Sequence, residues 1–261
     1  MRLAMLSAML LVLATAAEAR LTATAIEFVG ASPPANAQVR LSLTLQDEAG
    51  APQTLGAATA HTPSVLILAD YACQALCGPI LSLTAASLER SGLQAGRDYR
   101  LIVVGLDPRK GPPDAKAMKA AQIGEEGDLV KASTFLSADE VTLQQLAAAL
   151  GYRSSYDAEN DQFAHPAVVF VLTADGRVAR TLSALGVDAG NLRLALVEAG
   201  EGRIGSTADT IRLLCYGFDP AAGRYTPSIR LLLGLGWLLT AMALGGGVGI
   251  MLLTRSRASA G

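Results

Sequence analysis

Two short apolar runs in the first half of the chain constrain the fold most strongly. Ser64-Val-Leu-Ile-Leu-Ala69 and Leu101-Ile-Val-Val-Gly-Leu106 contain no charged residue. Runs of this length are typical of central strands that are covered on both faces, which requires helices between them. Apolar residues at helical spacing over Ile80 to Leu93 predict one such helix. The pattern indicates an α/β domain.

The remaining elements extend this architecture. Ser137-Ala-Asp-Glu140 has the pattern of a capping box before a helix, and Ala174-Asp-Gly176 has the pattern of a hairpin turn. The further predicted elements are a strand at Arg40–Leu45, helices at Pro112–Ile123, Leu143–Leu150 and Asn191–Ala199, and a hairpin of Ala167–Thr173 with Arg177–Leu182. This order predicts three layers, with a central β-sheet and helices on both faces.

The N-terminal end has the pattern of an export signal. Arg2 precedes an uncharged apolar run, and residues 1–19 finish in Ala17-Glu18-Ala19, a small-x-small cleavage signature. A first buried helix is the alternative interpretation. We expect a signal peptide over residues 1–19, a mature chain that starts near Arg20, and a loosely ordered lead-in over residues 20–40, rich in Ala, Pro and Ser.

The C-terminal end has the pattern of a membrane anchor. Leu231 to Leu253 is a run of 23 residues without a charge. At about 1.5 Å per residue such a helix crosses a hydrocarbon layer of about 30 Å. Arg255 and Arg257 follow it and favour a cytoplasmic tail. We expect a folded domain over residues 41–226, one transmembrane helix over residues 229–253 and a tail over residues 254–261.

Composition narrows the function classes. The formal net charge is −2, with 21 basic and 23 acidic residues mixed along the chain, which gives no electrostatic footprint for nucleic acid. The chain contains no Gly-x-x-x-x-Gly-Lys and no His-Glu-x-x-His motif, so nucleotide hydrolysis and zinc proteolysis have no support.

The cysteine pair Cys73 and Cys77 is the first candidate site. It lies just after the predicted strand that ends near Ala69 and at the start of the following helix, where α/β sheets commonly place ligands. If the helix has begun by Cys73, the spacing of four puts both sulfurs on one face, and the helix dipole stabilises a thiolate. A reactive or metal-binding pair and a stabilising disulfide are both open interpretations.

His165 is the second candidate, one of two histidines in the chain. His165-Pro166 immediately precedes the predicted strand Ala167–Thr173. In a thioredoxin-like sheet the loop entering this strand lies across from the cysteine helix, commonly with a cis-proline, a role that Pro166 is placed to fill. Two thiolates and one imidazole form a soft ligand set suited to Cu(I) that could also hold Cu(II). The alternative is an ordinary loop histidine, and His61 is expected at the surface.

Three motifs together resemble a known family. Asp70-Tyr-Ala-Cys73-Gln-Ala-Leu-Cys77, Val104-Gly-Leu-Asp107-Pro108 and Phe163-Ala-His165-Pro166 through Asp175-Gly176-Arg177 are similar to motifs of the Sco/SenC family. These are thioredoxin-like copper proteins that assist cytochrome c oxidase assembly. The segment around Cys215 to Tyr225 resembles a bacterial subgroup with a C-terminal span. The resemblance covers roughly residues 40 to 226.

The resemblance implies a specific site and function. Cys73, Cys77 and His165 match the family's copper ligands, Asp107 matches an acidic position near the metal, and Pro166 would lie beside it. It further implies a metallochaperone in a bacterial inner membrane, with its domain on the periplasmic side and a partner that is the copper-centre subunit of cytochrome c oxidase or another copper chaperone. Relatives usually carry prolines in or around the cysteine motif, whereas here residue 74 is Gln, residue 78 is Gly and the one proline is Pro79, so copper affinity and redox potential could differ.

Other functions remain open at this point. Cys73 and Cys77 could instead serve a thiol-disulfide oxidoreductase that acts on cysteines of the oxidase or of a copper chaperone. A peroxidase is less attractive, because both cysteines lie in one short segment without a threonine shortly before Cys73. A purely structural domain with a disulfide is the remaining interpretation. Cys215, the third cysteine, is expected to be structural or idle.

Overall fold

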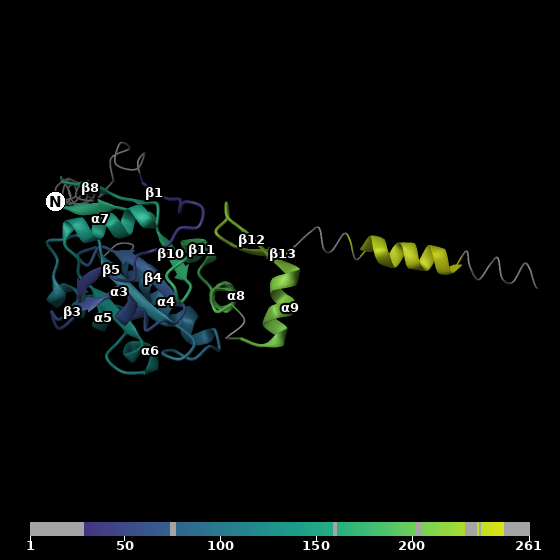
Figure 1. The fold of residues 1–261 in the computed structure, drawn as a ribbon, viewed down its shortest axis with the longest axis horizontal. Coiled ribbons are helices and arrows are strands. Elements are labelled where there is room, and N and C mark those ends of the chain that lie inside the picture. The colour runs from purple at the N-terminus through teal and green to yellow at the C-terminus, as the bar shows by residue number, and fades with distance from the viewer. Residues whose placement is uncertain are drawn as a thin grey trace, which may run out of the picture.

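A five-stranded mixed sheet forms the centre of the molecule (Figure 1). The computed structural model describes residues 29–73, 77–158, 161–201, 205–227, 234 and 236–247. The strand order is β11-β10-β4-β5-β6, in which β4, β5 and β6 are parallel and β10 is antiparallel to β4 and to β11. The strands are β4 (Ser64–Ala69), β5 (Arg100–Gly105), β6 (Ser133–Leu136), β10 (Val168–Leu172) and β11 (Val178–Ser183).

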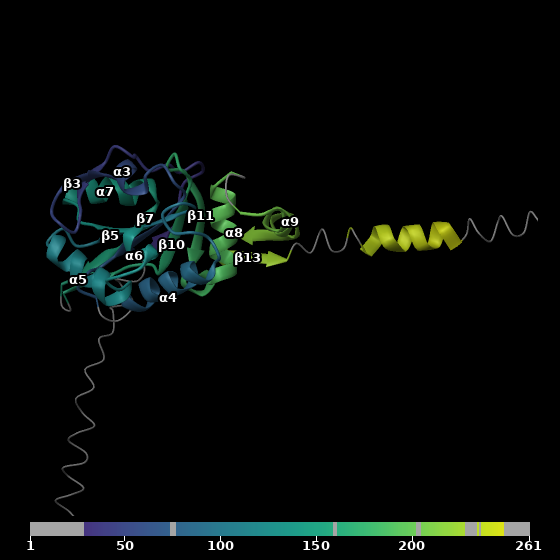
Figure 2. The same cartoon turned by 90° about the horizontal axis from the view of Figure 1, so that it is seen from below.

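Helices cover both faces of this sheet because alternate strand residues point to opposite sides. Val65 and Ile67 belong to one buried cluster, and Leu66 and Leu68 belong to another. The first cluster contains side chains of α4 (Cys77–Arg90), α5 (Pro112–Gln122) and α8 (Ala189–Ala199), and the second contains side chains of α3 (Leu55–Thr59) and α7 (Glu140–Ala149). Figure 2 shows α4 and α5 below the sheet and α3 and α7 above it. The predicted α/β class with a central sheet and helices on both faces is confirmed.

Two local predictions are wrong. The alternating run Arg40–Leu45 is a strand only from Thr44, since Leu43 N donates to Arg40 O at 3.1 Å and closes a turn. The strand that follows is β2 (Thr44–Gln46), which pairs with β3 (Pro52–Thr54). The cap of α7 is Asp139, whose carboxylate accepts from Thr142 N at 2.7 Å. Ser137 cannot fill that role because its backbone pairs with Gln46.

Several elements carry no clear sequence signal. They are β1 (Gly30–Ala31) with β7 (Tyr152–Arg153), α6 (Asp128–Lys131), β6, the hairpin of β8 (Ser155–Asp157) and β9 (Gln162–Ala164), the 3-10 turn η1 (Ala184–Gly186), α9 (Thr207–Cys215), and the hairpin of β12 (Tyr216–Asp219) and β13 (Arg224–Pro227). Part of the expected lead-in is also packed. Val39 is buried, and its backbone N donates to Gly176 O at 2.9 Å, so the described fold begins before residue 41.

The expected signal peptide, residues 1–19, and the expected tail, residues 254–261, lie outside the described residues. Of the expected span over residues 229–253, the structure describes residues 234 and 236–247, which are helical. Within the described part of the chain, no helix has the length and apolar character that crossing a bilayer requires.

Candidate functional site

One edge of the central sheet collects the three motifs that the sequence analysis singled out. β4 and β5 run parallel and end together, with Ala69 opposite Gly105. The motif with Cys73 follows β4, and Asp107 follows β5. Because β10 is antiparallel to β4, its first residue lies at this same edge, and His165 comes three residues before it. The topology therefore brings both motif loops and the His165 segment to one place.

The loop that carries Cys73 is shaped by the carboxylate of Asp70, which is 1% exposed. The side-chain Oδ1 of Asp70 accepts from Ala72 N at 2.9 Å, and the backbone carbonyl of Asp70 accepts from Cys73 N at 3.1 Å. These bonds form a turn, so Cys73 precedes the helix and α4 begins at Cys77. The condition that a helix has begun by Cys73 is therefore not met. Residues 74–76 and the side chain of Cys77 lie outside the described part of the structure.

Tyr71 anchors the same loop to the core. Its hydroxyl donates to Leu136 O at 2.8 Å and lies 3.2 Å from Val103 O, so it spans the ends of β5 and β6. Burial raises the pKa of Tyr71 well above its ordinary value, which keeps the hydroxyl a donor. Its ring lies against the backbone of Gly105, where an added Cβ would stand 2.8 Å from the ring atom Cε2. The site thus requires a glycine at the end of β5.

Asp70 also connects the cysteine loop to the histidine segment. Its Oδ2 accepts a long hydrogen bond of 3.4 Å from Phe163 N. Phe163 belongs to β9, two residues before His165. A single buried carboxylate therefore bonds to the chain next to Cys73 and to the chain next to His165. Among the contacts described, this one ties the predicted ligand segments together most directly.

The His165 side chain is half-buried, and its Nδ1 lies 3.4 Å from the carbonyl oxygen of Pro166. This geometry suits the tautomer in which Nδ1 carries the hydrogen and Nε2 keeps the lone pair that a metal requires. The peptide bond before Pro166 is trans, so the expectation of a cis-proline is wrong. The trans form is the lower-energy one, and the β8–β9 hairpin leads the chain into β10 without a cis turn.

Asp107 is almost fully buried, and its carboxylate is engaged by a side chain that the sequence analysis did not consider. Arg109 Nε lies 2.8 Å from Oδ1 and Nη2 lies 2.7 Å from Oδ2. Burial raises the pKa of Asp107, but the hydrogen bonds from Arg109 lower it more, so the pKa is below its usual range. Asp107 is therefore ionised at neutral pH, and its carboxylate anchors the guanidinium of Arg109.

The ligand set itself stays a prediction. Among the side chains that the structure describes, no group of three or more His, Cys, Asp or Glu residues could hold a metal ion. The thiol of Cys77 lies outside those described side chains. His61 is exposed, as expected. The side chain of Cys215, at the end of α9, lies outside the described residues.

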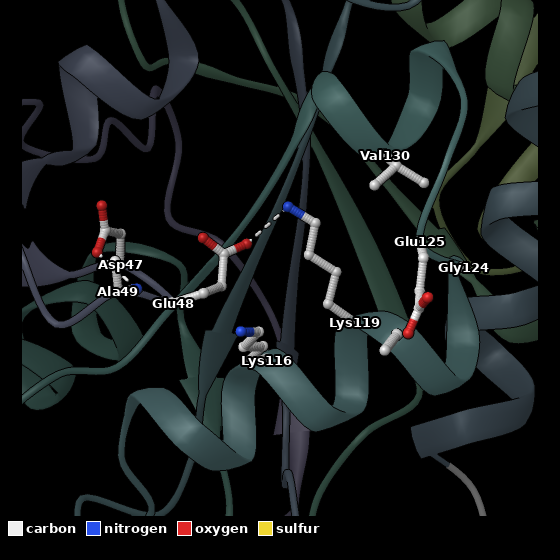
Figure 3. Close-up of a pocket in the computed structure, with 9 residues that line it drawn as sticks. Asp47, Glu48, Ala49, Lys116, Lys119, Gly124, Glu125 and Val130 are labelled. Carbon is white, nitrogen blue, oxygen red and sulfur yellow. Dashed lines mark hydrogen bonds and ion pairs between the residues drawn. The ribbon is translucent and has the colours of Figure 1, made fainter.

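A hollow of about 470 Å³ lies elsewhere, between the β2–β3 turn and α5 (Figure 3). Glu48 and Lys119 point toward each other across it, with Nζ 2.8 Å from Oε1. Glu48 also accepts from Phe135 N at 2.9 Å, and Lys119 donates to Ser133 O at 2.6 Å. These charged groups thus bind the turn and α5 to β6. None of the predicted site residues lines this hollow.

The described fold is similar to that of solved proteins. A candidate electron transfer protein from Aquifex aeolicus VF5 is 22% identical with a TM-score of 0.56, and the match covers 64% of this chain and 94% of that chain. A candidate electron transport protein from the same organism is 23% identical with a TM-score of 0.52, covering 64% and 98%. Arabidopsis thaliana ScoI with copper bound is 14% identical with a TM-score of 0.49, covering 60% and 94%. At these identities the first two matches show a shared fold, and the third is too distant to support more.

No family model matches the chain, and no curated protein matches it.

Proposed function

We propose that this chain is a copper-binding metallochaperone of the Sco/SenC kind, which delivers copper to the copper-centre subunit of cytochrome c oxidase. One observation carries the proposal: the Cys73 loop and the His165 segment meet at the carboxyl end of β4, joined by the buried carboxylate of Asp70. The sequence resemblance to Sco/SenC proteins supports it, and so does the fold that this chain shares with the two Aquifex aeolicus proteins.

The donor chemistry fits copper as a cargo. Two thiolates and one imidazole nitrogen are soft, low-coordinate ligands that suit Cu(I), and the imidazole makes Cu(II) acceptable too. We assign Cys73, Cys77 and His165 as the ligands, with Asp107 and Pro166 beside them. Copper binds these cysteines as thiolates, so exchange with a disulfide of another protein, which takes up the two electrons and leaves a Cys73–Cys77 disulfide, would remove both sulfur ligands and release the cargo. A carrier that alternates between reduced and oxidised states would suit transfer to a recipient.

We place the protein in a bacterial inner membrane, with the domain on the periplasmic side. A signal peptide over residues 1–19 and an anchor over residues 229–253 would give this orientation. The helical residues 236–247 expose large apolar side chains, among them Trp237 at 73% and Leu244 at 66%. Exposed apolar side chains of this size on a helix support contact with lipid.

A second candidate function is thiol-disulfide exchange through the same cysteines. It is favoured by the position of Cys77 at the first residue of α4, since the N-terminal end of a helix stabilises a thiolate. The substrates would be cysteines of the oxidase or of another copper chaperone. A simple exchanger does not require an imidazole, so His165 separates the two functions.

The test is a Cu(I) titration of the full chain, reduced without oxygen, against a competing chelator. We expect about one copper per chain, with competitive binding lost in Cys73→Ser, Cys77→Ser and His165→Ala. His61→Ala changes the other histidine and Cys215→Ser the third cysteine, and both controls should bind like the unchanged chain. The copper-carrier function would be contradicted if the chain does not compete for Cu(I). Disulfide exchange that persists in His165→Ala and disappears in Cys73→Ser would then support the thiol-disulfide oxidoreductase.

A further inference from the structure

The guanidinium of Arg109 lies between the end of β5 and the hairpin that leads to His165. On the β5 side it makes a two-pronged ion pair with Asp107, and its own backbone N donates to Asp107 Oδ1 at 2.9 Å. The side chain of Asp107 is 3% exposed, so the carboxylate that anchors Arg109 is fixed in the protein interior. A guanidinium held at both oxygens has a defined direction, which a lysine ammonium cannot reproduce.

The other side of the same guanidinium contacts the β8–β9 hairpin. Nη1 donates to the Tyr156 hydroxyl at 3.0 Å, and Nη2 donates to Asp161 Oδ1 at 2.9 Å. The Tyr156 hydroxyl donates to the same carboxylate at 2.6 Å, and the guanidinium carbon lies 4.7 Å from the centre of the Tyr156 ring. Arg109 therefore holds the hairpin through two hydrogen bonds and a cation–π contact.

The hairpin transmits this position to His165. Tyr156 pairs with Phe163 across the two strands, and their ring centres lie 5.1 Å apart. Ser155 pairs with Ala164, the residue immediately before His165. The chain is thus constrained by strand pairing up to the residue that precedes the imidazole.

We propose that Arg109 is a positioning residue that holds His165 over the Cys73 loop by clamping the β8–β9 hairpin to Asp107. This inference rests on the proposed function, since it assigns Arg109 to the same copper site. In this proposal Arg109 is not a copper ligand and acts through its contacts with Asp107 and with the hairpin.

The first test is a double-mutant cycle on Cu(I) affinity in the full chain. Groups that orient a metal ligand are commonly worth about 10- to 100-fold in affinity, so Arg109→Ala should weaken binding by about 10-fold or more. The His165→Ala variants are compared against a weaker competing chelator, which still reports residual copper binding by the two thiolates. If Arg109 acts through His165, adding Arg109→Ala to His165→Ala should cause almost no further loss. If the losses of Cu(I) affinity caused by Arg109→Ala and His165→Ala simply add in the double variant, the proposal is overturned. Arg97→Ala is the matched control, because Arg97 forms a similar two-pronged pair with its neighbour Asp98 away from the site.

The second test separates positioning from general stability. In the Cu(II) form, electron paramagnetic resonance should show coupling to one imidazole nitrogen in the unchanged chain, weakened in Arg109→Ala and partly restored in Arg109→Lys. An imidazole signal identical in all three proteins, despite weaker binding in Arg109→Ala, would overturn the proposal.

A metal-free test distinguishes a failure of this inference from a failure of the proposed function. Without copper, Arg109→Ala should speed amide hydrogen exchange in residues 155–157 and 161–164 and shift the imidazole resonances of His165, while the amide of Ala72 stays unchanged. If the unchanged chain binds no copper, the copper proposal fails, and this measurement still decides whether Arg109 positions His165. Unaltered exchange and unaltered His165 resonances would refute it.

Discussion

The cysteine loop, residues 70–73, and the β8–β9 hairpin, residues 155–164, lead to the same predicted site but are held in different ways. The loop is fixed by buried groups: Asp70 is 1% exposed and Tyr71 is 8% exposed. The hairpin shares one long bond with Asp70, from Phe163 N, and its side-chain contacts with Arg109 lie at the surface, with Tyr156 42% exposed and the side chain of Asp161 68% exposed. Buried bonds are costly to break, whereas exposed ion pairs add little stability.

The contrast indicates which part of the site is rigid and which part can adjust. Changes at the loop should unfold or distort the domain, because they leave buried polar groups unsatisfied or open a cavity. Changes at the hairpin should move His165 while the core stays intact. A carrier that must both bind and release its cargo benefits from one fixed ligand segment and one adjustable segment.

The largest expected effect comes from the buried tyrosine. Tyr71→Ala should lower the free energy of unfolding by about 3 to 5 kcal/mol, as truncations of large buried aromatic side chains do. Tyr156→Ala removes the same type of side chain from the hairpin and should leave the unfolding midpoint nearly unchanged. Denaturant unfolding with the slope held constant measures both. Equal losses of stability for the two tyrosines would contradict the view that the loop is anchored in the core and the hairpin at the surface.

Removal of the carboxylate that joins the two segments should have the next largest effect. Asp70→Ala leaves the amides of Ala72 and Phe163 without their acceptor, at a cost of about 1.5 to 3 kcal/mol in the free energy of unfolding. Asp47→Ala is the matched control, since Asp47 accepts from Ala49 N and Ala51 N, both at 2.9 Å, in an exposed turn. The control should lose clearly less stability. A loss at Asp47 as large as that at Asp70 would show that burial does not set the cost.

A methyl group at the end of β5 gives a smaller and sharper test. In Gly105→Ala the new Cβ would stand 2.8 Å from the Tyr71 ring, which must shift, and overpacking of this kind costs about 1 to 3 kcal/mol. Gly217→Ala is the control, because nothing lies within 4 Å of a Cβ added there. Thermal unfolding compares the two variants, and the reactivity of Cys73 with a thiol reagent should change only in Gly105→Ala. An unchanged melting temperature and thiol reactivity in Gly105→Ala would contradict the assigned packing.

The smallest expected effect is that of acid on the hairpin. The pKa of Asp107 is lowered in the folded state, so its ion pair with Arg109 stabilises the protein fully above the unfolded pKa of about 3.9. This contribution is lost as the pH falls through the lower folded-state pKa. Amide resonances of Tyr156 and Phe163 should therefore shift below about pH 4, before those of the cysteine loop. The pKa of Asp161 is also lowered, by its hydrogen bonds with Tyr156 and Arg109, so Asp107→Asn should reduce this transition and Asp107→Asn with Asp161→Asn should remove it. A simultaneous shift of loop and hairpin would contradict separate anchoring.

The sequence predicts the sheet well where burial alone decides the structure. Ser64–Ala69 is a strand over its whole predicted length, because a continuous apolar run of this size has no stable place outside a covered sheet. The helix expected at Pro112–Ile123 is α5, which starts at the same residue, since Pro112-Pro113 opens a first helical turn without loss of a hydrogen bond.

The polar parts of the site are not predictable in this way. Ser155–Asp157 and Gln162–Ala164 are three residues each, too short to show an alternation of apolar residues, and Tyr156 in the first of them contacts Arg109, which lies 47 positions earlier in the chain. Arg109 and Asp161 are 52 positions apart, and no local pattern connects them. The role of Asp70 could have been predicted in part, because a charged residue directly after a fully buried strand requires hydrogen-bond donors in the protein interior.

The most direct test of the central claim is X-ray absorption of the full chain loaded with one equivalent of Cu(I). If the cysteine loop and the His165 segment form one site, the spectrum should fit two sulfur ligands and one nitrogen ligand per copper, and His165→Ala should remove the nitrogen. A copper bound by sulfur alone in the unchanged chain would contradict the convergence of the two segments.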